Sequence, residues 1–251
     1  MPSPITSFRF SRTVVVALAA GLLLSGCTFE DTEQKKTATA DATVAEAVTA
    51  VEVKDARSGS IEVTPGTGPG VTIHRTVHYR GDEAPKPAQR VSGGVLTFTE
   101  GCSDTCSIDY RLEVPASATV KLESSSGNVT VAGVAAADLA SSSGDVKAEG
   151  IAGPLKVRTS SGSVTATGLA GPTADVRASS GDARLVFTKP PASATAETSS
   201  GDVTLTVPQA PYEITTATTS GSQDTLPTTP KAPSHLSIHT TSGDILIAPA
   251  G

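Results

Sequence analysis

Residues 124–133 read SSSGNVTVAG, and six similar stretches follow: SSSGDVKAEG (141–150), TSSGSVTATG (159–168), ASSGDARLVF (178–187), TSSGDVTLTV (198–207), TTSGSQDTLP (218–227) and TTSGDILIAP (240–249). Their glycines are 17 to 22 residues apart and lie at Gly127, Gly144, Gly162, Gly181, Gly201, Gly221 and Gly243. Seven near-copies at so regular a spacing predict a repeat protein in which each copy is one structural unit.

Each unit has the same internal order, which the third copy shows clearly. Residues 155–159 (LKVRT) alternate apolar and polar side chains, residues 160–163 (SSGS) form a turn, residues 164–167 alternate again, and residues 168–172 (GLAGP) bend the chain back. Alternation with a period of two is typical of a β-strand with one buried face. Serine and aspartate favour turns, and we expect the turn glycine to supply a positive φ. One unit is therefore two short strands joined by a turn.

A unit with two short strands cannot bury its apolar face alone, but stacked copies can. The position two residues after the repeat glycine is aliphatic in six copies and is interrupted once, by Gln223; the six are Val129, Val146, Val164, Ala183, Val203 and Ile245. Stacking them in one column predicts an all-β, single-domain β-solenoid of 17–22-residue coils. An antiparallel sandwich of hairpins is the alternative, although it does not require so constant a turn.

Weaker copies of the pattern precede the ladder at residues 57–63 and 91–96. Their glycines, Gly59 and Gly93, are 34 residues apart, and Gly127 follows after another 34. Because 34 is twice 17, we expect one degenerate coil between each pair. The N-terminal part of the domain would then be the irregular cap that the open edge of a solenoid needs.

The first residues of the chain predict export. Arg9 and Arg12 precede an uncharged apolar run at 14–24, which is about 16 Å long as a helix and too short for a bilayer core of about 30 Å. This order is typical of a signal peptide, which we place at residues 1–26. The sequence LSGC at 24–27 resembles the lipobox of bacterial lipoproteins, and the resemblance implies that Cys27 is diacylated and becomes the mature N-terminus. An ordinary signal peptide followed by an accidental cysteine is the alternative.

Residues 27–50 are polar and rich in Ala and Thr, without strand alternation. We interpret them as a flexible tether between the membrane and the repeat domain at 51–251, with a short helix over 44–53 as the alternative. The expected location is the extracytoplasmic face of the cell membrane, where the lipid anchor makes the membrane contact.

Charge limits the partners of the exported protein. The whole chain has a formal net charge of −6, and removal of residues 1–26, which carry two arginines and no acid, makes it −8. An acidic surface argues against nucleic acid as a partner. A cell-wall polymer or an envelope protein is the expected partner, and no cofactor is expected.

Two further cysteines remain if Cys27 is lipidated. Cys102 and Cys106 form an even pair in an oxidising compartment, and the turn-forming Ser103 and Asp104 lie between them. We therefore expect a Cys102–Cys106 disulfide. A CxxxC metal or redox site is the alternative, although no third or fourth ligand is near in sequence.

Two groups of residues have the chemistry of metal ligands. Aspartates follow the repeat glycine at Asp145, Asp182, Asp202 and Asp244, but Asn128, Ser163 and Ser222 interrupt this column, so turn capping is the preferred interpretation. His74 and His78, like His235 and His239, are four residues apart. On a strand this separation is about 13 Å, which is too far for two ligands of one zinc ion. We therefore expect no metal site.

The remaining motifs do not indicate catalysis. Arg80-Gly81-Asp82 forms the tripeptide RGD, which some integrin ligands use, but a plain turn is the preferred interpretation. No G-x-S-x-G elbow occurs in the sequence, and no motif places a Ser, a His and an Asp together. The outward strand positions are mostly Thr, Ser, Lys and Glu without a dense cluster. We therefore expect that the protein is not an enzyme.

The lipobox, the stretch SGSIEVTPG (58–66) and the ladder of SSGDV, SSGSV and TSGDI resemble the bacterial β-strand-repeat family labelled "putative adhesin", a domain of unknown function. The resemblance covers about residues 50–251 and implies a β-solenoid in the cell envelope with no catalytic residues to carry over. The expected function is that of a membrane-anchored cell-surface lipoprotein with a non-catalytic, adhesin-like binding domain. The alternative is a structural or sensory accessory protein of the envelope, related to envelope stress.

Overall fold

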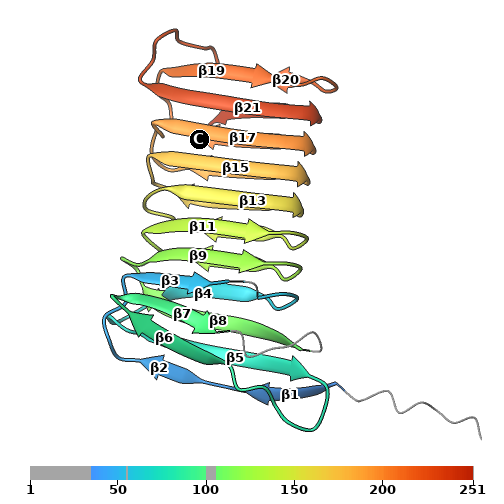
Figure 1. The fold of residues 1–251 in the computed structure, drawn as a ribbon. Helices are drawn as coiled ribbons and strands as arrows, with labels where there is room; N and C mark the ends of the chain where they lie inside the picture. The colour runs from blue at the N-terminus through green and yellow to red at the C-terminus, as the bar shows by residue number, and fades with distance from the viewer. Residues whose placement is uncertain (1–34, 55, 100–105, 251) are drawn as a thin grey trace, which may run out of the picture. The chain divides into compact units, whose positions relative to one another are not determined.

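The computed structural model describes residues 35–54, 56–99 and 106–250. The chain divides into two units, residues 1–33 and 34–251, and everything described belongs to the second. Every regular element in the described residues is a β-strand (Figure 1). In that part of the chain, the structure has no helix with the length and hydrophobicity that a membrane crossing requires.

The first of two sheets, sheet A, has 12 strands among the described residues. In spatial order they are β1 (Lys36–Thr39), β5 (Val71–Tyr79), β8 (Ser107–Pro115), β4 (Ile61–Gly66), β10 (Val129–Ala132), β12 (Val146–Glu149), β14 (Val164–Leu169), β16 (Ala183–Phe187), β18 (Val203–Val207), β22 (Ile245–Pro249) and β20 (Gln223–Asp224), and β2 (Ala42–Val44) also pairs with β5. From β8 to β20 neighbouring strands are parallel, whereas β5 is antiparallel to β1, β2 and β8.

The second sheet, sheet B, has 10 strands within the described residues. In spatial order they are β19 (Tyr212–Ala217), β21 (Ser234–Ser242), β17 (Ser193–Ser200), β15 (Thr173–Ser180), β13 (Leu155–Ser161), β11 (Ala136–Ser141), β9 (Thr119–Ser124), β3 (Ala50–Val53), β7 (Val95–Thr99) and β6 (Ala88–Ser92). Only the β6–β7 pair of these described strands is antiparallel.

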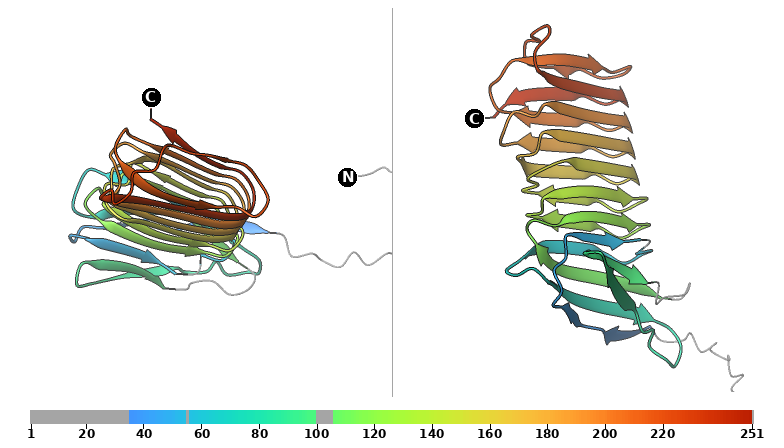
Figure 2. Two further views of the ribbon diagram at one scale, coloured as in Figure 1. Left: turned by 90° about the horizontal axis from the view of Figure 1, so that it is seen from above. Right: turned by 60° about the vertical axis from the view of Figure 1, so that its left-hand side comes forward.

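The repeat unit is one coil with one strand in each sheet. In the third copy of the pattern, β13 lies in sheet B, the SSGS turn follows, and β14 lies in sheet A. Figure 2 shows the two sheets facing each other as the walls of a flattened coil. The prediction of a β-solenoid is therefore confirmed, and the parallel pairing of successive coils excludes the antiparallel sandwich for the repeat region.

The core lies between the two sheets and consists of stacked aliphatic columns. The predicted column two residues after each repeat glycine is present in sheet A, where Val129 pairs with Val146, and the series continues through Val164, Ala183, Val203 and Ile245. Each of these side chains is at most 1% exposed. A facing column in sheet B is formed by Leu122, Leu139, Val157, Val176, Ala196 and Ile238. Small and medium aliphatic side chains fill the narrow space, so the near absence of aromatic residues is no obstacle to a core.

The coils do not stack in chain order at either end. The last coil in sequence, β21–β22, lies between β17–β18 and β19–β20, so that β19–β20 is outermost (Figure 1). At the other end, β3–β4 lies between β9–β10 and the strands β7 and β8. Gln223 interrupts the apolar column only in the outermost coil, where the column needs no further partner.

Residues 91–96 form a hairpin and not a coil. Ser92 pairs with Val95 between the antiparallel strands β6 and β7, and Gly93 and Gly94 have φ values of 59° and 78°. Two successive positive φ angles are what a two-residue type I′ turn requires. The expected degenerate coils at 34-residue spacing are also wrong, because the coil of Gly59 stacks directly on the coil of Gly127, with Ile61 opposite Val129. The predicted irregular cap consists instead of the antiparallel strands β1, β2, β5 and β6.

Part of the expected tether is built into this cap. β1 pairs with one end of β5, with Lys36 opposite Tyr79, and β2 pairs with the other end, with Val44 opposite Val71. Pairing of their backbone with β5 makes these residues strands, although their side chains lack a long alternation of apolar and polar residues. The expectation of a flexible tether over 27–50 therefore does not hold for residues 36–50, while residues 27–34 lie outside the described part of the chain.

The repeat glycines allow neighbouring coils to approach closely. A Cβ atom added to Gly162 would lie 2.3 Å from the carbonyl oxygen of Gly144, and one added to Gly144 would lie 2.1 Å from that of Gly127. Gly162 does not have a positive φ, so the expected conformational reason for glycine is wrong at this position. The space between coils is the reason that the structure gives.

Candidate functional site

The outward side chains of sheet B form straight rows, because parallel strands in register place equivalent residues side by side. One row lies near the starts of the strands and contains only small residues, which we call the small row: Ala50, Thr119, Ala136, Pro154, Thr173 and Ser193. Register pairs join Ala50 to Thr119, Thr119 to Ala136, and Thr173 to Ser193.

The next outward row along the same strands is charged, and its sign alternates from coil to coil. We call it the ionic row: Glu52, Lys121, Asp138, Lys156 and Asp175. The spacing between neighbours is one strand separation, about 4.8 Å. Like charges therefore recur only at every second coil, about 9.6 Å apart.

The two rows line a hollow of about 520 Å³ on the outer face of sheet B. It crosses β3, β9, β11, β13, β15 and β17 along the axis of the solenoid. Five strand separations give it a length of about 24 Å. No aromatic side chain is among the described residues that line it. This groove, as we call it, is long, narrow and polar on one side.

Ion pairs hold part of the charged wall in place. Arg158 Nη1 lies 3.3 Å from Asp138 Oδ1, and Arg177 Nε lies 3.3 Å from Asp175 Oδ1. Asp175 Oδ1 is nevertheless buried and accepts no hydrogen bond. Lys156 has no ion-pair partner among the described residues. The groove thus presents one donor, the ammonium group of Lys156, that its own side chains leave without an ion pair.

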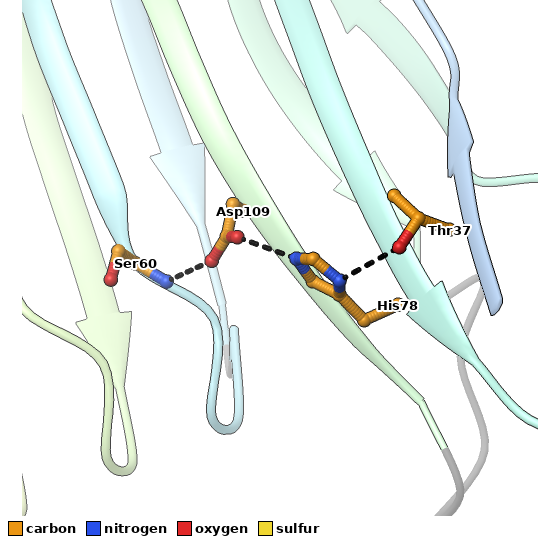
Figure 3. Close-up of polar contacts among 4 residues, drawn as sticks. All are labelled: Thr37, Ser60, His78 and Asp109. Carbon is orange, nitrogen blue, oxygen red and sulfur yellow. Dashed lines mark hydrogen bonds and ion pairs between the residues drawn. The ribbon is translucent and has the colours of Figure 1, made fainter. Parts of the chain in front are cut away.

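A second polar cluster lies in the N-terminal cap (Figure 3). His78 Nε2 lies 2.9 Å from Asp109 Oδ2, and His78 Nδ1 lies 3.4 Å from Thr37 Oγ1. The backbone N–H of Ser60 donates to Asp109 Oδ1 at 2.8 Å. The cluster therefore connects β1, β5 and β8 with the residue that directly precedes β4.

The order of carboxylate, imidazole and hydroxyl in this cluster is that of a hydrolase triad. However, the 3.4 Å between His78 and Thr37 is longer than the reach of about 3.2 Å expected between a base and its nucleophile. Each partner also ties a different strand of the cap. The geometry fits a structural tie better than a catalytic centre.

The aspartates that follow the repeat glycines bind the neighbouring coil. Asp145 Oδ1 accepts the N–H of Ser163 at 2.9 Å, and Asp182 Oδ1 accepts the N–H of Asp202 at 2.9 Å. Asn128 Oδ1 accepts the N–H of Asp145 in the same way at 3.1 Å. These side chains cap backbone groups as predicted, but the groups belong to the next coil and not to their own turn.

Asp244 is the last aspartate of this series, and its protonation should weaken the attachment of the outermost coil. Its Oδ1 accepts the N–H of Ser222 at 2.7 Å. This hydrogen bond is the main cause of the lowered pKa of Asp244, and a hydrogen bond from the Ser222 side chain is the second cause. A carboxyl whose folded-state pKa is lowered stabilises the fold above its unfolded pKa, about 3.9, and this stabilisation is lost as the pH falls through the lower folded pKa.

Asp244→Asn keeps an acceptor, as Asn128 shows, but removes the charge. Wild type should be the more stable of the two near neutral pH, and urea unfolding should show this difference closing below about pH 4. A difference that stays constant down to about pH 2 would contradict the assignment.

Of the residues predicted as sites, Cys27 and Cys102 lie outside the described residues. Cys106 directly precedes β8, and its pairing with Cys102 stays a prediction. His74 and His235 each lie beside a carboxylate of their own. His74 Nδ1 is 3.4 Å from Asp41 Oδ1, and His235 Nδ1 is 3.4 Å from Glu213 Oε2. Among the described residues, no three side chains of His, Cys, Asp or Glu gather as a metal site.

The RGD tripeptide lies directly after β5. Gly81 has a φ of 101°, and Lys36 Nζ donates to its carbonyl oxygen at 2.8 Å. Lys36 Nζ also lies 3.4 Å from the exposed Asp82 carboxylate. A glycine in the left-handed region with a held carbonyl fits the turn that the sequence predicts.

The groove was not predicted from the sequence, although the sequence contains a signal for it. The sixth residue before the repeat glycine is Lys121, Asp138, Lys156 and Asp175 in the first four copies. Aligning the repeats on their glycines and following this one position shows the alternating charges. The order of the coils at the N-terminal end, which adds Glu52 to the row, is not visible in that alignment.

A family model described as Toastrack DUF4097 matches residues 43–248 of the chain. No curated protein matches this chain. Solved structures similar to the chain include a "putative adhesin" from Bacteroides fragilis, with 15% identity, a TM-score of 0.47, and coverage of 87% of this chain and 99% of that one. A "putative adhesin" from Parabacteroides distasonis has 13% identity and a TM-score of 0.40, and the match covers 87% of this chain and 98% of that one. A "putative cell adhesion protein" from Clostridium sporogenes has 10% identity and a TM-score of 0.39, and the match covers 86% of this chain and 100% of that one.

Proposed function

Since the chain belongs to the Toastrack DUF4097 family, a family of domains of unknown function, we propose a function from the geometry of the chain itself. We propose that it is a non-catalytic, adhesin-like binding module on the outside of the cell membrane. The observation that carries the proposal is the groove, about 24 Å long and 520 Å³ in volume. An extended partner fits such a site, because equivalent side-chain positions recur at every coil along it. The expected partner is a cell-wall polymer or an envelope protein.

The membrane attachment that we propose is a lipid anchor on Cys27. Its support is the order of Arg9, Arg12, the apolar run at 14–24 and the lipobox-like LSGC. Two acyl chains hold a protein at a membrane stably, whereas one gives marginal binding. The anchor would leave eight residues, 28–35, between Cys27 and the first strand, β1.

Cys27→Ala tests the anchor. We expect the variant to accumulate as an uncleaved precursor or as soluble protein, whereas wild type should partition into the detergent phase in Triton X-114 extraction. Cys106→Ala serves as the control, because loss of a cysteine elsewhere should leave partitioning unchanged. Mature Cys27→Ala protein that still partitions into detergent would contradict the anchor.

Ala136→Leu tests binding through the groove. Ala136 is a half-exposed member of the small row, and a leucine side chain there would occupy the hollow. Ala132→Leu is the matched control, because Ala132 is also half-exposed and at a strand end but lies in sheet A. The full chain in detergent micelles is mixed with isolated cell walls and sedimented. We expect the retained fraction to fall at least tenfold for Ala136→Leu and to stay at the wild-type level for Ala132→Leu.

Equal retention of wild type and both variants would overturn the proposal. Capture of one stoichiometric membrane protein, independent of Ala136, would then favour the structural or sensory accessory role. The two functions are therefore separated by the same pair of variants.

A further inference from the structure

We propose that the groove takes an extended glycan without net charge, with about one sugar ring at each coil. This inference rests on the proposed function and names the class of its ligand. Three features of the groove carry it: the balance of its charges, the spacing of its side chains, and the alternation of hydrogen-bond donors and acceptors along one wall.

The charged residues of the groove cancel in sign. The lining contains the acids Glu52, Asp138 and Asp175, and the bases Lys121, Lys156 and Arg177. Since the signs alternate along the ionic row, a polyanion would meet a carboxylate at every second coil, and a polycation would meet an ammonium group as often. Like-charge contacts of this kind select against a partner of one sign. The complementary ligand is neutral, or carries both signs in balance.

The spacing of the side chains disfavours a polypeptide. Equivalent side-chain positions of the groove recur about every 4.8 Å, while an extended polypeptide advances about 3.3 Å per residue and repeats each face about every 6.6 Å. Neither period stays in step with the coils over the length of the groove. The backbone groups of β3, β9, β11, β13, β15 and β17 are also used within sheet B, so a peptide cannot join the sheet here. A pyranose ring in an extended chain is close in length to one coil.

The chemistry of the walls suits sugar hydroxyls, which both donate and accept. The ammonium group of Lys156 is a donor without an ion-pair partner among the described residues, and the partly exposed carboxylates of Asp138 and Asp175 are acceptors on the two neighbouring coils. Donors and acceptors therefore alternate along this wall of the groove. On the floor, Ala50, Ala136 and Pro154 offer flat apolar contact for the C–H edges of a ring.

Binding of short polymers of defined chemistry tests the inference. The full chain in detergent micelles is titrated by calorimetry with cellohexaose and chitohexaose as neutral glycans, with hexagalacturonate as an anionic glycan, and with a twelve-residue peptide of alternating Glu and Lys. We expect at least one neutral hexaose to bind at least tenfold more tightly than the uronate and the peptide. Its affinity should also exceed that of the corresponding disaccharide at least tenfold, because six rings engage six coils.

Variants assign the binding to the groove. Asp175→Asn and Lys156→Gln should each weaken the neutral hexaose at least fivefold, and Ala132→Leu on the opposite sheet should not change it. The inference is overturned if the peptide or the uronate binds more tightly than both neutral glycans, or if neither neutral glycan binds. In that case, the proposed function still holds if Ala136→Leu sediments less with cell walls than wild type does. If Ala136→Leu and wild type sediment equally, the proposed function is wrong as well.

Discussion

Replacing Gly162 by valine should lower the free energy of unfolding by about 3 kcal/mol or more. For a domain of this size, that corresponds to a fall of roughly 10 °C in the melting temperature. The reason is steric, since even the first side-chain carbon would lie 2.3 Å from the Gly144 carbonyl oxygen. The obstacle is the backbone of Gly144 and Asp145 in the preceding coil, and backbone cannot rotate away as a side chain can.

The valine would also disturb hydrogen bonds that join three coils. The N–H of Ser161 donates to the carbonyl of Ser142 at 2.8 Å, and the N–H of Gly162 donates to the carbonyl of Ser180 at 3.1 Å. Separating the turns to admit a side chain lengthens these bonds. Gly162→Ala should already show most of the loss, because the Cβ atom itself is what does not fit.

Gly68→Val is the matched control for Gly162→Val. A Cβ atom on Gly68 would meet nothing within 4 Å, and Gly68 has no positive φ. Its substitution should change stability by no more than about 0.5 kcal/mol. Thermal unfolding followed by circular dichroism checks both variants, and the same melting temperature for Gly162→Val and Gly68→Val would show that close stacking is not what requires glycine.

Replacing Arg75 by methionine should lower the free energy of unfolding by about 3 kcal/mol. Arg75 is 4% exposed, on the inward face of β5. Its Nε donates to the carbonyl of Ala40 at 2.8 Å, and its Nη1 donates to the carbonyl of Pro87 at 3.1 Å. Hydrogen bonds from a charged group contribute about 1.5–3 kcal/mol each, and methionine would leave both acceptors without this donor.

Burial lowers the pKa of Arg75, while Tyr110 and Asp41 act in the opposite direction. The side chain holds the link between β1 and β2 as well as the segment before β6. Hydrogen exchange in Arg75→Met should therefore accelerate first at residues 36–44, ahead of the repeat coils. Exchange that accelerates equally in all coils would contradict a local role for Arg75 in the cap.

Arg177→Met is the control for loss of an arginine. Arg177 is 55% exposed and forms ion pairs with Asp175 at 3.3 Å and with Glu197 at 3.5 Å. Surface pairs of this kind contribute at most about 1 kcal/mol. If Arg177→Met destabilised the protein as much as Arg75→Met, burial would not be the decisive difference between the two arginines.

The core columns could be predicted from the sequence, because period-two alternation and a fixed offset from a glycine are local signals. Val129, Val146 and Val164 stack as expected for this reason. The function of Gly162 was not predictable in the same way. A sequence does not distinguish a glycine required by a positive φ from one required by the closeness of a neighbouring coil. At Gly162 the distance to the Gly144 backbone identifies the second reason.

Gly93 shows a second limit of the sequence. The stretch VSGGVL fits a repeat turn as well as a type I′ hairpin, and its distance of 34 residues from Gly59 and from Gly127 favoured the wrong choice. Turn chemistry specifies how a chain reverses but not which strand becomes its neighbour. For the same reason, the sequence could suggest alternating charges before the repeat glycines but not the row that adds Glu52 to them.

The order of the coils has a consequence for biogenesis. A solenoid that adds coils in chain order can fold from its first end while the rest of the chain is still being synthesised. Here the coil β19–β20 has no neighbour to dock on until β21–β22, which follows it in the chain, is in place. This end of the solenoid can therefore close only after β21 and β22 have been synthesised. A pulling force on the residues after β22 acts on a coil inserted between two others and not on a free outer coil. Truncation after residue 233 would remove residues 234–251, 18 residues that include β21 and β22, and would leave β19 and β20 without the strands on which they pair.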